Sequence, residues 1–160
     1  MLAHFVLLLL AAMGALHKGD PFPSFAGEAL SGASIALPAA GKSAIVLFSF
    51  SRAAGGDARL WNDRIAKELT LPSFSVMLLE SVPRLLRGMV SSGIRSSIPL
   101  SMRDRTVFAY KDEAVWKSRL AVADENRAYV VLLNKEGRVH WMNSSAFRDS
   151  EFARLQDAAR

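Results

Sequence analysis

The stretch from Phe48 to Trp61, FSFSRAAGGDARLW, has the layout of a reactive turn. An apolar, strand-like run ends at small residues, and a helical pattern follows. Redox enzymes often place two cysteines at such a turn, where the helix N-terminus stabilises a thiolate. The chain has no cysteine, so thiol nucleophiles, disulfides and thiolate metal ligands are excluded. The residues at the turn are instead Ser51, Arg52, Ala53, Ala54 and Gly55.

Two interpretations of this turn remain open. The hydroxyl of Ser51 is not a nucleophile by itself, because a serine needs a base and an oxyanion site, and no histidine lies near it in the sequence. In the first interpretation the turn is structural, with Asp57 as the helix cap and the glycines in a tight turn. In the second, the helix N-terminus and Arg52 bind an anion or a carboxylate. We favour the first and assign no catalytic residue.

Other short motifs do not indicate a cofactor or a metal site. The GKS at Gly41–Ser43 lacks the glycine that a phosphate loop needs five residues earlier, where Ala36 stands, and an apolar strand pattern follows it. His4 and His17 lie near the N-terminus, and His140 lies in a strand pattern. No carboxylate stands at metal-ligand spacing from any of them. We therefore expect no metal and no cofactor.

A basic helix face is the second candidate binding surface. Arg84, Arg87 and Arg95 lie on the polar side of a helical pattern, with Arg103 and Arg105 just beyond it. The chain carries a net charge of +5, which favours an anionic partner. The face is either solvated or docks on anionic lipid or an acidic protein. No run of five lysines or arginines exists, so we do not expect nucleic-acid binding.

The N-terminus is typical of an export signal. The apolar run Phe5–Leu16 is too short to span a bilayer comfortably, and Ala12 and Gly14 are the small residues expected before a cleavage site. We predict export to the periplasm or the outside, with a leader at 1–16 and one domain at 17–160. An uncleaved anchor, which would hold the protein at a membrane, and a buried N-terminal element remain alternatives.

Apolar periodicity predicts strands and helices in alternation after an extended lead-in at Gly19–Phe25. Gly137 occupies the turn of a closing hairpin, at the position that favours a positive φ. The predicted strands are Ala33–Leu37, Ala44–Phe50, Phe74–Leu79, Thr106–Tyr110, Tyr129–Leu133 and Val139–Met142. The predicted helices are Leu60–Leu69, Val82–Ile94, Asp112–Val122 and Ser150–Ala159.

Apolar residues on these helices predict the core. On the helix Val82–Ile94 they recur at i, i+3, i+4 and i+7, which indicates an amphipathic helix. On the helix Asp112–Val122 we expect Val115, Trp116 and Leu120 to face inward. The three tryptophans are expected in or near the core: Trp61, Trp116 and Trp141.

Two long stretches resemble thioredoxin-like and peroxiredoxin-like domains. They are GDPFPSFAGEALSGASIALP at 19–38 and AIVLFSFSRAAGGDARLW at 44–61. The resemblance implies an α/β thioredoxin-like fold, with a central mixed sheet flanked by helices and an N-terminal extension. It also implies a cis-proline at Arg127–Ala128, where this chain has alanine. The substrate-clamping loop of the family is therefore expected to be altered here.

A narrower resemblance concerns the mitochondrial assembly-factor family that helps to build the membrane sector of F-type ATP synthase, with its bacterial relatives. The similar stretches are Leu78–Pro99, Arg103–Tyr110 and Asn126–Met142, with His140 where arginine is more usual. The resemblance implies a redox-inactive binding or assembly-chaperone module for a membrane or exported protein. Its expected partner is a protein, membrane-associated or acidic, with contact to a membrane surface. The alternative is an oxidoreductase by ancestry with non-thiol or residual activity.

Overall fold

The computed structural model describes residues 14–160, and its elements follow the predicted order, with one extra strand and one short 3-10 helix. The strands are β1 (Phe25–Glu28), β2 (Ser34–Leu37), β3 (Ala44–Ser49), β4 (Ser73–Leu78), β5 (Thr106–Ala109), β6 (Tyr129–Leu133) and β7 (Val139–Asn143). The helices are α2 (Arg52–Glu68), α3 (Arg84–Ser97), η1 (Leu100–Arg105), α4 (Glu113–Arg119) and α5 (Asp149–Ala158). Strand β1 was missed because its sequence, FAGE, has a weak strand signal; it forms by pairing with β2.

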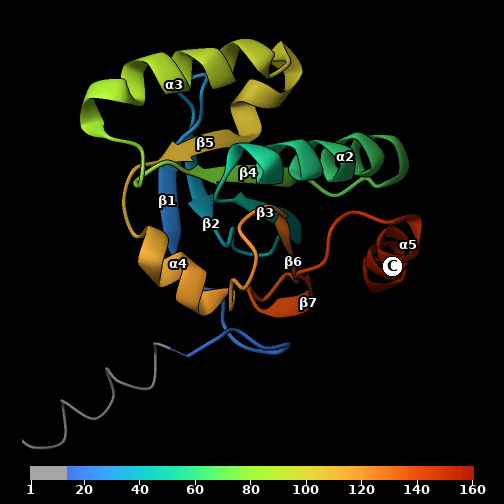
Figure 1. Cartoon of the computed structure of the whole chain (residues 1–160). Coiled ribbons are helices and arrows are strands. Elements are labelled where there is room, and N and C mark those ends of the chain that lie inside the picture. The colour runs from blue at the N-terminus through green and yellow to red at the C-terminus, as the bar shows by residue number, and fades with distance from the viewer. Residues whose placement is uncertain (1–13) are drawn as a thin grey trace, which may run out of the picture.

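The central sheet has the strand order β5-β4-β3-β6-β7 (Figure 1). Strand β3 pairs in parallel with β4 and antiparallel with β6, so the sheet is mixed, as expected. All six residues of β3 are buried. This explains the near-continuous apolar run in its sequence, because a central strand is covered on both faces.

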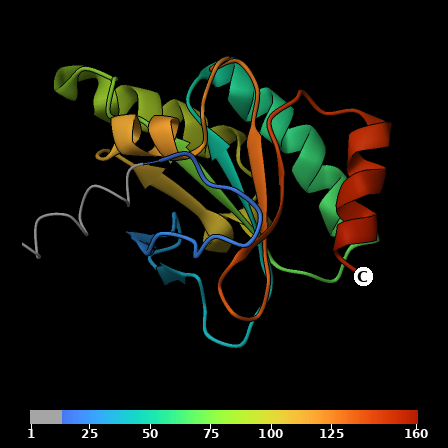
Figure 2. The ribbon, with the colours of Figure 1, turned by 90° about the horizontal axis from the view of Figure 1, so that it is seen from below.

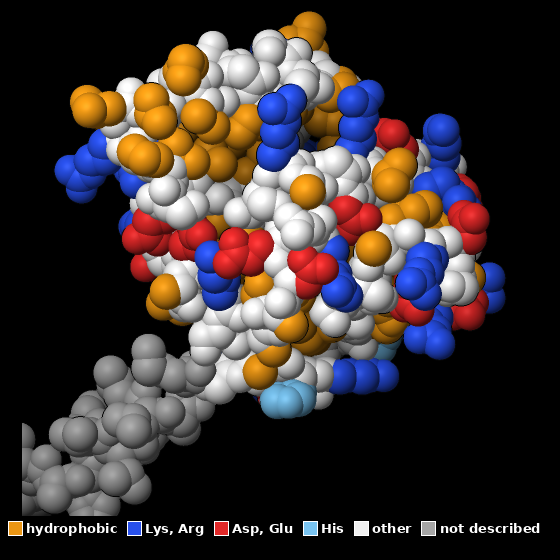
Figure 3. Space-filling model, viewed as in Figure 1, with side chains coloured by type: hydrophobic (Ala, Val, Ile, Leu, Met, Phe, Trp, Pro, Cys, Tyr) orange, Lys and Arg blue, Asp and Glu red, His pale blue; other side chains and the backbone are white. Residues whose placement is uncertain are grey.

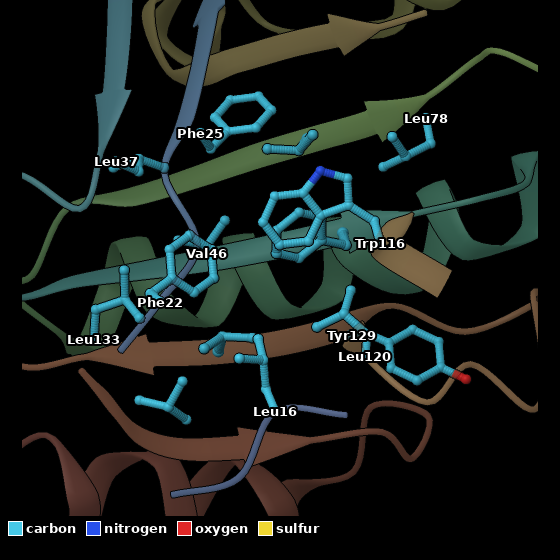
Figure 4. Packing of buried hydrophobic residues seen from close by; sticks show 14 of the residues in the cluster. Leu16, Phe22, Phe25, Leu37, Val46, Leu78, Trp116, Leu120, Tyr129 and Leu133 are labelled. Carbon is cyan, nitrogen blue, oxygen red and sulfur yellow. The ribbon is translucent and has the colours of Figure 1, made fainter. Parts of the chain in front are cut away.

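Helices cover both faces of the sheet. Helices α2 and α5 pack side by side on one face, around Trp61 and Phe152 (Figure 2). Helix α4 and the β1–β2 hairpin cover the other face, where Phe22 and Phe25 pack around Trp116 (Figure 4). The predicted burial of the tryptophans is confirmed for Trp61 and Trp116, and Trp141 is partly buried against the α2–α5 core.

The described chain begins against the end of α4. Leu16 is buried in the core, and its N–H donates to the carbonyl oxygen of Arg119 at 2.7 Å. The guanidinium of Arg119 in turn donates to the carbonyl oxygen of Gly14 at 2.8 Å. Most of the expected export signal falls on residues 1–13, which lie outside the described residues. Within 14–160 no helix combines the length and the apolar character needed to cross a membrane.

Helix α3 contradicts the simple expectation for an amphipathic helix. None of its residues is buried, and Leu85 is 98 % exposed. The side that faces the body carries Val90 and Ile94, which are half-buried. The apolar residues of α3 cover a wider part of the helix surface than the part that contacts the body, so some of them remain exposed to solvent. Val115 of α4, also expected to face inward, is 46 % exposed.

Candidate functional site

The hydroxyl of Ser51, in the turn after β3, is engaged in hydrogen bonds within the protein. Ser51 has an extended backbone and is the N-cap of α2, and its Oγ accepts the N–H of Ala54 at 3.1 Å. The same hydroxyl donates to the carbonyl oxygen of Glu125 at 2.6 Å. The helix therefore begins at Arg52, and Ala53 lies in its first turn. The predicted structural role of this turn is supported by both bonds.

The details of the predicted cap are wrong. Gly55 and Gly56 lie within α2 and form no tight turn, because the serine before Arg52 already starts the helix. Asp57 also lies within α2. Its Oδ2 accepts the N–H of Ala128 at 2.9 Å, and its Oδ1 accepts the N–H of Phe147 at 2.8 Å. One carboxylate thus joins α2 to the start of β6 and to the segment before α5.

The sequence carries a signal for the role of Asp57. Ala54, Asp57 and Trp61 follow one another at i, i+3 and i+7, so the aspartate lies on the inward side of α2. A carboxylate on such a side needs hydrogen-bond donors. The loop where the family resemblance implies a cis-proline supplies one of them. Proline has no N–H, so only a residue such as Ala128 makes this bond.

A second polar network connects α4 to the same turn. Glu113 is buried, accepts the N–H of Ser81 at 3.1 Å and pairs with Lys117 at 2.9 Å. Lys117 also pairs with the carboxylate of Glu125 at 2.7 Å and lies 5.8 Å from the ring centroid of Phe50. The hydrogen bond to Glu113, followed by that to Glu125, raises the pKa of Lys117. The lysine is therefore held as a cation.

These contacts assign structural roles to the polar groups around the turn. Ser51 donates its proton to a carbonyl oxygen, and Lys117 is held protonated between two carboxylates. Neither is in the state that a nucleophile or a general base requires. In the described part of the chain no three His, Asp or Glu side chains come together as a metal site would require.

The predicted arginine face lies on α3, and most of its guanidiniums bind backbone carbonyls. Arg87 donates from Nε to the backbone carbonyl oxygen of Val82 and from Nη2 to that of Glu80, at 3.0 Å each. Its guanidinium lies 5.2 Å from the ring centroid of Tyr110. Arg95 donates to the carbonyl oxygen of Leu30 at 2.8 Å. These bonds attach α3 to the body of the protein.

The remaining arginines complete the surface. Arg103 donates to the carbonyl oxygens of Ile98 and Arg95 at 3.3 and 3.1 Å. Arg84 is exposed and makes no hydrogen bond or ion pair within residues 14–160. The two groups of candidate site residues thus lie on different helices, α2 and α3, and no hydrogen bond or ion pair of the described chain joins them.

Exposed apolar side chains accompany these arginines. Hydrophobic side chains gather over α3 in the surface view, with basic side chains beside them (Figure 3). The exposed fractions are 98 % for Leu85, 70 % for Met89, 45 % for Leu86 and 77 % for Leu100. The sequence predicted an amphipathic helix here, but periodicity alone does not say which side of the helix meets the body.

A cleft that the sequence did not indicate lies between β1 and the end of β5. It has a volume of about 470 Å³. Phe25, Phe108, Tyr110 and Trp116 form part of its wall, and Lys111 adds a cation. Aromatic residues on separate elements form this wall, so no local motif marks it.

Comparisons with known proteins agree on the fold. No protein-family model matches the sequence, and no curated protein matches it. The thioredoxin domain of a thiol-disulfide oxidoreductase from Bacteroides vulgatus is similar with a TM-score of 0.63 and 18 % identity, over 91 % of this chain and 100 % of that one. An exposed lipoprotein thioredoxin from Streptococcus pneumoniae is similar with a TM-score of 0.58 and 16 % identity, over 85 % and 98 %.

A third similar structure is a peroxiredoxin-like protein rather than a thioredoxin. A peroxiredoxin-like protein from Aquifex aeolicus has a TM-score of 0.56 and 10 % identity, over 90 % of this chain and 88 % of its own. At these identities the likeness concerns the fold. The protein therefore has a thioredoxin-like fold, and it lacks the cysteines on which thiol–disulfide exchange depends.

Proposed function

We propose that the protein is a redox-inactive binding module that assists the assembly or protection of a membrane or exported protein. The observation that carries the proposal is the surface of α3, where apolar side chains and uncompensated arginines stay outside a well-packed core. Exposed apolar patches of this kind are typical of interaction sites. The chain keeps the thioredoxin-like fold but, because it has no cysteine, it cannot perform thiol–disulfide exchange.

Three further observations support this role. The stretches 78–99, 103–110 and 126–142 resemble the ATP synthase assembly factors, which suggests an assembly function on a membrane sector. The apolar N-terminal run supports export, and one structural neighbour is an exposed lipoprotein. The net charge of +5 favours an acidic or membrane-associated partner.

The α3 surface is proposed to hold the module at its membrane site, and the protein partner itself is proposed to bind at a second surface, the α2 turn. Arg52 and Ala53 are exposed there, at the carboxyl end of β3. Lys42 is exposed just before β3, at the opposite end of the same strand. Positions 53 and 42 are therefore a matched pair of exposed sites that flank the two ends of β3.

The test is site-specific photo-cross-linking in a membrane extract. A photoreactive residue at Ala53 should capture a defined protein, and the same residue at Lys42 should not. Adding Arg52→Glu to the chain that carries the photoreactive residue at position 53 should reduce the capture of an acidic partner. Equal capture at both positions would contradict the proposal.

The enzyme alternative is tested on the same protein. We expect no reduction of insulin disulfides and no peroxide turnover above the buffer rate, because the chain has no thiol. Turnover by the pure protein at a rate proportional to its concentration would favour residual, non-thiol oxidoreductase activity instead.

A further inference from the structure

We infer that α3 is a membrane-interface helix, whose exposed Leu85, Leu86 and Met89 enter an anionic lipid surface while neighbouring arginines meet the head groups. The inference rests on the proposed binding function and names the surface on which the module is held. With α3 on the membrane, the α2 turn would be free to bind a protein partner at the same membrane.

The two sides of α3 have different neighbours. Val90 and Ile94 lie one turn apart on the side that meets the body, and both are half-buried. Leu85 and Met89 also lie one turn apart, but on the outer side, where they are 98 % and 70 % exposed. Figure 3 shows the resulting hydrophobic surface over α3. An outward apolar side beside a charged one is the pattern of helices that lie in a lipid interface.

The charge of this segment is positive and uncompensated. Residues 81–103 contain four arginines and no aspartate or glutamate. Three of the guanidiniums donate to backbone carbonyls, which fixes their position without neutralising them: Arg87, Arg95 and Arg103. None of the four pairs with a carboxylate within residues 14–160. A rigid group of cations beside apolar side chains complements an anionic lipid surface.

Three of the four serines of α3 have hydroxyl groups that are bonded within the helix, which suits such an interface. The hydroxyls of Ser91, Ser96 and Ser97 donate to carbonyl oxygens three residues earlier, at 3.2, 2.8 and 2.7 Å. Their donors are therefore satisfied within the helix. Gly88 and Gly93 add no side chain to this helix, and the space around a Cβ at either position is open.

A lipid surface explains these features better than a second copy or a protein partner does. In a symmetric dimer the arginines of one copy would face those of the other, and like charges repel. A stable protein interface takes about 800 Å² from each partner, more than a few side chains on one helix provide. A bilayer sets no such minimum area, because it accepts each apolar side chain separately.

The experiment is co-sedimentation of the full chain with vesicles. Vesicles of phosphatidylcholine mixed with phosphatidylglycerol are compared with vesicles of phosphatidylcholine alone. We expect the first to bind the protein more strongly, and added salt to weaken that binding. Leu85→Ser with Met89→Ser should lower the partition by about tenfold or more. Equal partition of this variant and the wild type would overturn the inference.

Matched controls separate α3 from the rest of the chain, including its apolar N-terminal run. Leu60→Ser with Val115→Ser removes two other exposed apolar side chains and should bind as the wild type does. Arg84→Glu should weaken binding several-fold, and Arg59→Glu, at an exposed position of α2, should weaken it less. Equal loss in both arginine variants would indicate general charge attraction and contradict a role for α3.

The absence of cysteine allows a direct readout. A single cysteine introduced at position 89 can be labelled with an environment-sensitive dye, and we expect anionic vesicles to shift the dye's emission to the blue. The same dye on a cysteine at position 60 should show no shift. No shift at position 89 would reject insertion of α3. If Ala53 still cross-links a membrane protein, the inference fails alone and the proposed function stands. If vesicles bind but no partner is captured, the proposed function fails instead.

Discussion

Single side chains in this protein join segments that are far apart in the sequence. Asp57 accepts two backbone N–H groups, one 71 and one 90 residues away. Ser51 caps α2 and at the same time donates to a carbonyl 74 residues away. Both side chains come from the segment where the thioredoxin-like resemblance implies the redox cysteines. Here the same positions hold the segment in place.

Replacing Asp57 tests this assignment. Asp57→Ala leaves the N–H groups of Ala128 and Phe147 without their acceptor, and each unsatisfied buried group costs about 1–3 kcal/mol. Ala128 is fully buried and Phe147 is half-buried, so we expect a total loss of about 2–4 kcal/mol in the free energy of unfolding, measured by urea denaturation. Asp63→Ala, at an exposed position of the same helix, should change it by less than about 0.5 kcal/mol. A similar effect of both substitutions would contradict the role of Asp57.

Helix α4 is held to its neighbours by charge as well as by packing. Trp116 stacks on Phe48 with 4.7 Å between ring centroids. On the adjacent side, Glu113 connects the helix to the loop before α3, and Lys117 connects it to the segment that follows α4. The position of α4 therefore depends on the charges of Glu113 and Lys117 as well as on packing in the core.

Lys117→Met tests the charge network through pH. The folded pKa of Lys117 is raised above its ordinary value of 10.5, chiefly by Glu113. The stabilisation is therefore complete below about pH 10.5 and is lost as the pH rises through the folded pKa. We expect the variant to be less stable by about 1–2 kcal/mol at neutral pH, with the difference shrinking in the alkaline range.

The measurement is urea unfolding at a series of pH values. Lys42→Met, at an exposed loop position, serves as the control and should show no such trend. A stability difference between wild type and Lys117→Met that stays constant from neutral to strongly alkaline pH would mean that charge does not contribute.

At the scale of the whole molecule, the core reaches further toward the N-terminus than the predicted domain start at residue 17. Leu16 is buried beside Leu120 and Val139 in one core cluster. The segment around it bonds to the ends of α4 and β7, through Arg119 and through Val139. The lead-in is therefore an integral part of the fold.

Two truncated chains test this boundary. A chain that begins at Gly14 keeps the burial of Leu16, whereas one that begins at Lys18 loses it. Burial of a leucine side chain contributes about 1.5–3 kcal/mol, so we expect the second chain to unfold at lower temperature. Leu16→Ala in the first chain should reproduce most of the loss. Equal melting temperatures of the two chains would place the boundary after Leu16.

The sequence by itself determined the order of the strands and helices from β2 onward, the burial of Trp61 and Trp116, and the exclusion of thiol chemistry. These depend on local periodicity and on residue types, both of which can be read along the chain. Only the tertiary structure decided that Ser51 rather than Asp57 caps α2. It also decided which part of the apolar stripe of α3 meets the body and which part stays exposed. The physical reason is that both depend on distant partners: the N–H groups at 128 and 147 for Asp57, and for α3 the packing against the body, which leaves none of its residues fully buried.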